Sequence, residues 1–416
     1  MDSLLGKERS WPYEERYSSQ IVRSRESGAA LVLALLLTGL LLLLGSALLT
    51  IASSERQVGM NDRSGVQALY LAEAAVERAR RLLPGFTVND VLTNNRVLGD
   101  WVNETATGSG TYRATVANNV TSIGGLPQDG GTAVCGITTC DTDGLVVVTG
   151  TGFFQGAQRV VRAVVEVPSI LSPPALLTIV NSDVDPLFEG ESFLVSGFDR
   201  NIDGSAGSSP ARPSIALVTS EAASAVRSIL TTGQQSRLLG AGSTPSIDVI
   251  SNATTSDALQ RLKLQLARQA DRVLVNPGTI SEDLRGIDGG GQVTLVKGNP
   301  SADPNQGLDT AGDATLVGTG YGAGVLIVTG HLTLRGSYRF DGVVLVVGDG
   351  SRLVLGGDAT ITGSILIANR TSGNLGRAGV VIKDRAQLHF SQEALRKAGR
   401  LLSARLRTWQ ELPATQ

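Results

Sequence analysis

The sequence predicts an α+β chain, mainly β, with a long N-terminal transmembrane and amphipathic helix, a mixed lobe, and a C-terminal parallel β-solenoid-like lobe with a terminal helix. Three observations predict this class. A long apolar run lies near the N-terminus, short Val/Ile-rich runs recur between glycines from 312 to 379, and 50 of the 416 residues are glycine while 42% are hydrophobic. Because the glycines follow no three-residue period and apolar residues are plentiful, they indicate the turns of a folded chain, not collagen or disorder.

Residues 1–28 form a polar leader, which we expect to be cytoplasmic, and no charge occurs from Ser27 to Ser54. The uncharged, mainly apolar run 29–52 is 24 residues long and would span roughly 36 Å as a helix, enough to cross a membrane. A signal peptide is the alternative, but its apolar region is usually shorter, about 7 to 15 residues. Basic residues near the span predict a cytoplasmic N-terminus: Arg16, Arg23 and Arg25 precede it, against Arg56 and Arg63 after it.

The helix is expected to continue past the membrane as an amphipathic extension, so that 29–83 form one element. Apolar residues recur three or four positions apart and share one stripe: Leu69, Ala72, Val76, Ala79 and Leu83. Pro84-Gly85 ends the helix. The alternative is a simple anchor followed by a separate juxtamembrane helix.

The N-terminal region resembles PilX-type pilus-assembly proteins, which are minor-pilin-like components of type IV pili. The matching residues are Gly28 to Val32, Glu55, Arg56, Arg63 and Ala72 to Ala75. The resemblance implies cleavage by prepilin peptidase between Gly28 and Ala29, N-methylation of Ala29, and partnership with other pilin-like subunits and the pilus assembly machinery. It also implies a single-pass protein of the bacterial inner membrane whose C-terminal region is extracytoplasmic, with a place at the pilus or cell surface. Leu33 stands where major pilins carry glutamate, so a terminal, regulatory or absent place in the filament stays open.

Residues 84–168 read as a β-rich, pilin-like lobe and 169–310 as a mixed α/β region, with helices expected at 220–232 and 256–274. Cys135 and Cys140 lie in a turn-rich loop. In an extracytoplasmic domain a small-loop disulfide is expected, with free thiols as the alternative.

Glycine-led strands then recur, beginning at Gly324, Gly342, Gly363 and Gly379. These starts lie 18, 21 and 16 residues apart. Spacings of about 20 residues between short Val/Ile runs predict stacked solenoid coils over 311–390, with an antiparallel meander as the alternative. These glycine-led segments also resemble the Gly-rich region that follows PilX-type N-termini in other proteins. Residues 391–416 are expected to hold a basic amphipathic helix that begins at Ser391 and docks on the end of the β-stack; membrane binding is the alternative.

One motif suggests metal chemistry. Asp199, Asn201 and Asp203 open a D-x-N-x-D-G pattern like that of a calcium loop, but Pro210 occupies the position of the bidentate glutamate. A non-EF calcium turn and a plain Asp/Asn turn are therefore the two interpretations. Two cysteines and two histidines argue against a zinc centre, and a net charge of −2 argues against nucleic acid. No other cofactor is expected.

The sequence thus predicts a non-catalytic, minor-pilin-like structural component of type IV pilus assembly, anchored in the membrane before assembly. One alternative is a membrane-tethered surface or adhesive protein outside any filament. The other is a carbohydrate-active β-helix enzyme, which would require acidic and basic side chains from successive coils to converge in one cleft. The candidates for that convergence are Asp341, Asp349 and Asp358 with Arg335, Arg339 and Arg352.

Overall fold

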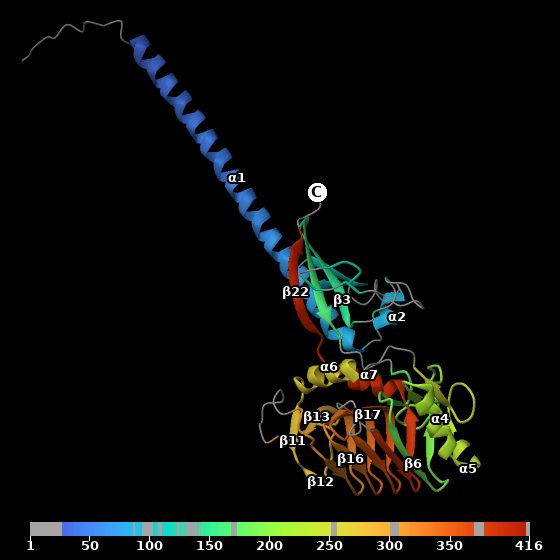
Figure 1. Cartoon of the computed structure of the whole chain (residues 1–416). Coiled ribbons are helices and arrows are strands. Elements are labelled where there is room, and N and C mark those ends of the chain that lie inside the picture. The colour runs from blue at the N-terminus through green and yellow to red at the C-terminus, as the bar shows by residue number, and fades with distance from the viewer. Residues whose placement is uncertain are drawn as a thin grey trace, which may run out of the picture. The chain divides into compact units, whose positions relative to one another are not determined.

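The computed structural model describes residues 27–85, 88–93, 103–106, 110–122, 125, 126, 128, 129, 138, 141, 143–167, 173–250, 256–299, 308–369 and 378–412. The chain divides into two compact units at Arg63/Ser64. The fold class predicted from the sequence is confirmed: a long apolar helix precedes mostly β structure with parallel sheets (Figure 1).

The first helix, α1 (Ser27–Leu82), is followed by a 3-10 turn, η1 (Leu83–Gly85), and a short helix, α2 (Val88–Thr93). Proline has no amide hydrogen and clashes with the preceding turn, so Pro84 ends the helix where the sequence predicts. In the first unit, side chains from Ala30 to Arg63 are exposed apart from the two partly covered glycines, Gly39 and Gly45. Among the described helices, α1 is long and apolar enough to cross a membrane.

In the second unit, residues 64–82 of α1 pack on an antiparallel sheet of strand order β1-β2-β3-β4-β22. The strands are β1 (Asn103–Ala106), β2 (Gly110–Asn118), β3 (Leu145–Phe154), β4 (Ala157–Glu166) and β22 (Arg405–Leu412). The packing face is made of small residues on the helix and valines on the strands, and it forms a hydrophobic core of its own. We keep the name used in the sequence prediction, pilin-like lobe, for residues 64–82 together with this sheet.

The C-terminal segment departs from the sequence prediction. The expected helix over 391–416 ends early, as α7 (Gln392–Arg400), and the chain then runs as β22 into the pilin-like lobe. Strand β22 pairs antiparallel with β4 from Arg405↔Glu166 to Leu412↔Val160. The helical prediction failed because Leu402 still falls on the apolar stripe, while the sheet edge that accepts β22 lies more than 200 residues away in sequence. Everything between β4 and β22 is therefore an insertion in the pilin-like lobe.

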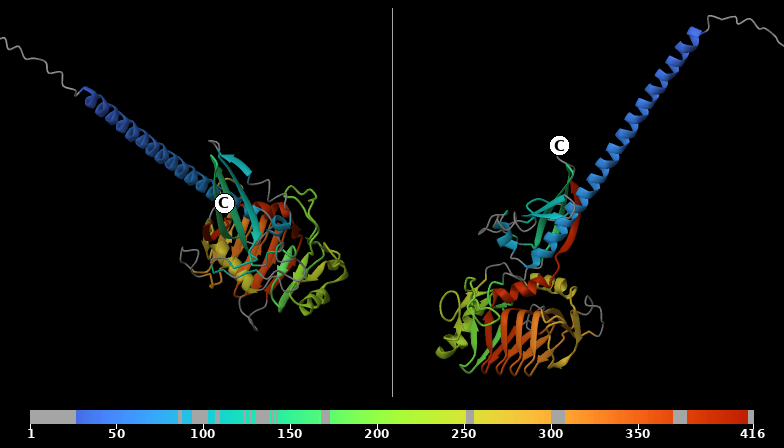
Figure 2. Two further views of the ribbon diagram at one scale, coloured as in Figure 1. Left: turned by 90° about the horizontal axis from the view of Figure 1, so that it is seen from above. Right: turned by 180° about the vertical axis from the view of Figure 1, so that it is seen from behind.

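The insertion, which we call the solenoid lobe, has two parallel sheets between which the chain alternates coil by coil (Figures 1 and 2). The 11-stranded sheet consists of β5 (Leu177–Ile179), β7 (Leu194–Ser196), β8 (Ile215–Leu217), β9 (Leu238–Leu239), β10 (Ile247–Val249), β11 (Arg272–Val275), β13 (Gln292–Lys297), β15 (Tyr321–Val328), β17 (Arg339–Gly348), β19 (Thr360–Asn369) and β21 (Gln387–Phe390). The 6-stranded sheet consists of β6 (Val184–Glu189), β12 (Gly278–Ile280), β14 (Ala314–Leu316), β16 (His331–Leu334), β18 (Arg352–Leu355) and β20 (Ala378–Lys383).

Three of the four predicted repeat starts stack directly, because Gly324, Gly342 and Gly363 are register partners in β15, β17 and β19. The fourth, Gly379, pairs instead with Arg352 in the other sheet. Its run of apolar residues resembles the others because both sheets bury their inward face in the same core. The parallel pairing excludes the antiparallel meander for this region.

The region 169–310 is not a separate mixed lobe, in contrast to the sequence prediction. Its strands β5 to β13 join the same two parallel sheets, and its apolar side chains belong to the same core. The helices of the solenoid lobe are α4 (Ser220–Ile229), α5 (Thr232–Gln235), α6 (Ser256–Ala267) and α7. Both α6 and α7 contact β15, β17 and β19, so the central strands are buried on both faces and read as continuous apolar runs.

Candidate functional site

The predicted processing site lies at the start of α1. Gly28 and Ala29 fall in its first turn, and Leu33, which stands at the position of the pilin glutamate, is 68% exposed. Apolar side chains continue along the exposed helix through Ile51. Such a surface is stable only in lipid or against other apolar helices, so this segment can serve both as an anchor and as an association surface.

The second half of α1 is held by a close approach between backbones. The predicted stripe is buried at Ala72, Val76, Ala79 and Leu83, while Leu69 is partly covered. Opposite it, strand β3 carries Gly150 and Gly152.

A Cβ atom at Gly150 would lie 2.2 Å from the carbonyl oxygen of Ala72, and one at Gly152 would lie 2.1 Å from that of Ala68. Only glycine leaves room for the helix at this distance. The sequence signal, two glycines interrupting a Val/Thr strand, was visible, but nothing in it indicated which element would approach.

A charged network joins the end of α1 to the returning chain. The Arg80 guanidinium donates to Glu77, with Nε to Oε2 at 2.7 Å, and to the carbonyl of Ala404 at 2.7 Å, next to β22. Arg81 adds a second hydrogen bond to Glu77 at 2.9 Å. The hydrogen bond from Arg80 is the main reason that the pKa of Glu77 lies below its usual value. Arg80 thus fixes the point at which the chain re-enters the pilin-like lobe.

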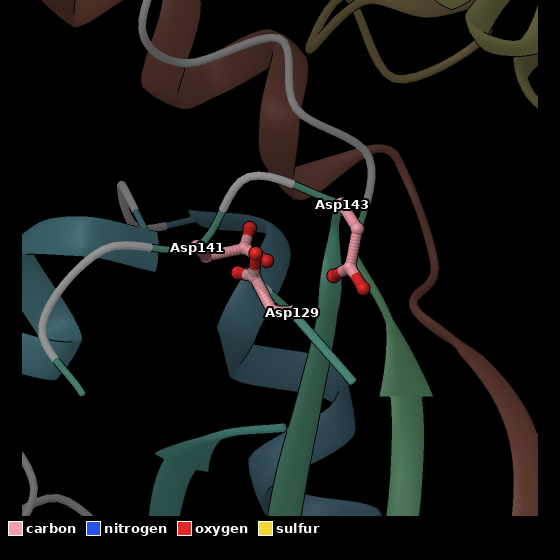
Figure 3. Close-up of side chains that lie close together, drawn as sticks. All are labelled: Asp129, Asp141 and Asp143. Carbon is pink, nitrogen blue, oxygen red and sulfur yellow. The ribbon is translucent and has the colours of Figure 1, made fainter. Parts of the chain in front are cut away.

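An acidic cluster that the sequence pattern did not reveal lies at one end of this lobe (Figure 3). One carboxylate oxygen from each of Asp129, Asp141 and Asp143 lies within 4.8 Å of the others. Figure 3 shows the carboxylates of Asp129 and Asp141 directed toward each other. Burial, and then the negative charge of Asp143, raise the pKa of Asp141 to about 7. Oxygen donors of this kind suit a hard cation such as calcium.

Neighbouring amides hold the acidic cluster in place. Asn118 Nδ2 donates to Asp129 at 3.0 Å, and Asn119 Nδ2 donates to Asp143 at 2.9 Å. The backbone of Asp141 donates to the Asn89 side chain at 2.8 Å, which ties α2 to the same end of the sheet. The carboxylates of Asp129 and Asp143 thus hold the end of β2 and the residue after it, while the backbone of Asp141 ties α2 to the segment before β3.

The predicted calcium residues occupy a loop of the solenoid lobe and hold backbone amides there. Asp199 accepts from Ser209 N at 2.8 Å and from Gln392 N at 2.9 Å, at the first turn of α7. Asp203 accepts from Ser205 N at 2.8 Å, and Asn201 donates to Ser205 Oγ at 3.0 Å. These bonds favour the Asp/Asn-turn interpretation, and calcium binding stays a prediction. Cys135 and Cys140 lie outside the described residues.

Of the side chains considered for a sugar site, Asp341 and Asp358 are engaged in two different ion pairs. Asp358 pairs with Arg385 at 2.6 Å, whereas Asp341 accepts from Arg339 at 3.0 Å and from the Tyr321 hydroxyl at 2.5 Å. The guanidinium of Arg285 lies 5.0 Å from the centre of the Tyr321 ring.

Within this group the side chain of Asp341 is only 1% exposed. Burial and Asp341 raise the pKa of Tyr321 to about 12. A tyrosine that acts as a catalytic base at neutral pH would instead need a lowered pKa. His389 is also buried, and this burial, together with the charge of Arg200, lowers its pKa to about 4. Asp341 and His389 therefore belong to the internal packing of the coils, whereas the Asp358–Arg385 pair is exposed.

Comparison with known proteins agrees with the N-terminal prediction. A family model described as PilX N-terminal matches residues 27–77, which spans both the apolar half of α1 and most of the half packed on the sheet. The predicted PilX-type N-terminal region is therefore confirmed, and at this end the chain is type IV pilin-like. No curated protein matches the chain.

Among solved structures, the chain is similar to the competence-associated pilin ComZ from Thermus thermophilus. The sequence identity is 12%, the match covers 84% of this chain and 97% of that chain, and the TM-score is 0.22. A TM-score this low means that the two folds do not superpose as wholes. The functional assignment therefore depends on the family match over the N-terminal region alone.

Proposed function

We propose that the protein is a minor-pilin-like structural component of type IV pilus assembly without catalytic activity. The observation that carries this proposal is the PilX N-terminal match over 27–77. The matched segment includes an uncharged apolar stretch and a helical half buried on a sheet, which are the two features that a filament subunit with a membrane-inserted precursor needs.

The proposed mechanism is mechanical. The apolar half of α1 holds the subunit in the inner membrane, N-terminus in the cytoplasm, until the assembly machinery extracts it, and the same surface then packs on other pilin-like subunits. Because Ala68 and Ala72 lie directly against Gly150 and Gly152, a force that reaches residues 64–82 is passed to the sheet. Leu33 cannot form the carboxylate pair of major pilins, which favours a place at a filament end.

Processing provides the first test. We expect prepilin peptidase to cleave between Gly28 and Ala29, and mass spectrometry of the purified protein to find a methylated Ala29 at its N-terminus. A Gly28→Val variant should keep the leader and remain in the membrane fraction, whereas Gly39→Ala, in open space on the same helix, should be processed normally. An N-terminus at Met1 in cells with active peptidase would overturn the proposal.

The rival function, a membrane-tethered surface protein outside any filament, predicts a different location. If the protein enters a filament, sheared surface fractions should contain it together with the other pilin-like subunits. A processed chain found only in membranes would favour the tethered alternative. The enzyme alternative has no such support, because Asp341 and Asp358 are engaged by neighbouring arginines.

The disulfide between Cys135 and Cys140 remains part of the proposal for an extracytoplasmic lobe. Peptide mapping under non-reducing conditions should recover one peptide pair joined by this bond. Recovery of both thiols in alkylated form from cells would instead favour free cysteines.

A further inference from the structure

A cleft of about 570 Å³ opens where the chain re-enters the pilin-like lobe. It is lined by the end of α1, the last turn of α6 with the residues after it, the start of β22, and Glu166 at the end of β4. The lining residues are Arg80, Glu166, Leu264, Gln265, Arg268, Gln269, Ser403, Ala404, Arg405, Leu406 and Arg407. All of them belong to the second compact unit.

The cleft is strongly cationic. Four arginines face one carboxylate, Glu166, which is paired with Arg407 at 2.6 Å. Arg80 shares Glu77 with Arg81. Arg268 and Arg405 are exposed and, among the described residues, have no side-chain hydrogen bond or ion pair. Two guanidinium groups are therefore available to a ligand, and each can grip a carboxylate with two parallel hydrogen bonds.

The same place offers apolar contact and an open strand. Leu264 is 42% exposed and Leu406 is 45% exposed. Strand β22 is the edge of its sheet, and β4 is the only described strand that pairs with it. An edge strand presents unpaired N–H and C=O groups in a row, and an extended peptide can add to it. The register shift between Leu406 and Thr408 places Arg407 in a bulge, so that its side chain turns onto Glu166.

We propose that this cleft and the open edge of β22 bind an extended acidic segment of a partner protein. Carboxylates of the segment would meet Arg268 and Arg405, its apolar side chains would meet Leu264 and Leu406, and its backbone would pair with β22. The arginines favour an acidic ligand because of charge complementarity. The exposed leucines and the open strand edge favour a peptide over a small acid. Among the described residues that line the cleft none is aromatic, which disfavours single-stranded nucleic acid because such ligands use stacking platforms.

The test uses the full chain in neutral detergent and a rhodamine-labelled peptide of alternating Glu and Thr, followed by fluorescence anisotropy at low and high salt. We expect saturable binding that weakens with salt, because the contact is largely between charges. A Lys-Thr peptide should not bind. The Glu-Thr peptide N-methylated on alternate residues should bind more weakly, since it keeps its charge but cannot pair with a strand edge on that side.

Variants locate the site. Arg268→Gln with Arg405→Gln should weaken binding roughly tenfold or more, because two charge-assisted contacts are lost. The matched control is Arg237→Gln with Arg335→Gln, two exposed arginines outside the cleft, which should change affinity less than roughly twofold. Both double variants should keep the wild-type thermal midpoint, because exposed arginines contribute little to stability.

Three results would overturn the inference: equal binding by the two double variants, equal binding of the Lys-Thr peptide, or complete competition by inorganic phosphate or a short oligonucleotide. Equal binding by the two double variants would mean that the peptide binds outside the cleft. Either of the other two results would mean that the cleft does not select an acidic peptide. Because the measurement uses the purified chain, its outcome is independent of leader cleavage and of filament entry, on which the proposed function depends.

Discussion

The pilin-like lobe and the solenoid lobe both depend on backbone segments that approach closely at glycines, but they reach this closeness in opposite ways. In the pilin-like lobe, Gly150 and Gly152 have ordinary strand conformations and make room for a helix from outside the sheet. In the solenoid lobe, Gly324, Gly342 and Gly363 have positive φ angles and stack on one another, coil upon coil. The first device is a single contact between distant elements, and the second is a repeated local conformation.

The two lobes also differ in how the chain connects their parts. The solenoid lobe is continuous in sequence, whereas the pilin-like lobe is completed only when β22 returns after the whole insertion. A solenoid behaves as a stack of neighbours, each coil supporting the next. The pilin-like lobe, in contrast, needs both ends of the insertion to be correctly placed. Damage to the stack should therefore reach β22, and damage to the helix contact should stay local.

The largest effect is expected from Gly342→Ala. A Cβ at this position would lie 1.9 Å from the carbonyl oxygen of Gly324, and the φ angle of +144° is one that side chains rarely adopt. We expect a loss of about 3 kcal/mol or more in the free energy of unfolding, from overpacking and backbone strain together. Denaturant titration followed by circular dichroism measures it. Gly290→Ala, where the new atom meets open space, should be neutral; equal stability of the two variants would contradict the stacking argument.

A smaller loss, about 1 to 3 kcal/mol, is expected from Gly152→Ala, because a single overpacked contact can relax by a shift of the helix. Hydrogen exchange should show faster exchange of amides in residues 64–82 while the solenoid strands stay protected. Gly59→Ala lies on the same helix in open space and serves as the control. Faster exchange throughout the solenoid lobe would mean that the two lobes unfold as one unit.

Asp199→Asn tests the loop at α7 and should cost about 1 to 2 kcal/mol, because Ser209 N and Gln392 N donate to different carboxylate oxygens and Asn replaces one of them with an NH2 group that cannot accept. Asp203→Asn keeps its acceptor for Ser205 and should have little effect. We expect the thermal midpoint of the wild type to be unchanged by a chelator, since these side chains are engaged in the turn. A rise in the midpoint with added calcium, lost in both variants, would establish the metal site instead.

The last effect concerns pH. The pKa of Asp141 is raised to about 7 from 3.8, so between these values the native state holds a proton that the unfolded chain has released. Stability of the pilin-like lobe should therefore fall as pH rises through this window, by up to about 1.4 kcal/mol for each pH unit. Denaturant titrations at the two ends of the window measure it, and Asp141→Asn should remove this dependence and stabilise the lobe at high pH. A wild type that is more stable at high pH would indicate a cation bound by the acidic cluster.

Sequence reasoning succeeded where a pattern is local. The uncharged run from Ser27 to Ser54 predicted a long apolar helix, the spacing of Ala72, Val76 and Ala79 predicted the packed stripe, and recurring glycine-led strands predicted parallel coils. It failed where the partner is remote. The segment 405–412 has no signal that distinguishes a helix end from a strand, because its state is decided by the edge of β4.

The candidate functional features also divide into those that a local sequence pattern predicts and those that depend on distant partners. The PilX-type segment over 27–77 could be identified from sequence, because its chemistry depends on the order of its residues along one helix. The acidic cluster and the arginine-lined cleft could not, since the three aspartates follow no recognisable ligand motif and the members of the cleft come from segments up to hundreds of residues apart. No periodicity connects Asp129 to Asp141, or Arg80 to Arg268 and Arg405.

The sequence by itself determined a membrane-length helix, its amphipathic continuation and a glycine-cornered β-stack, because hydrophobic periodicity and turn chemistry act over a few residues. Only the tertiary structure decided that the stack is an insertion, that β22 closes the pilin-like sheet and that Gly150 and Gly152 receive the helix. The physical reason is that strand pairing and close packing are made between whichever surfaces the folded chain brings together, and a linear pattern does not record which surfaces those are.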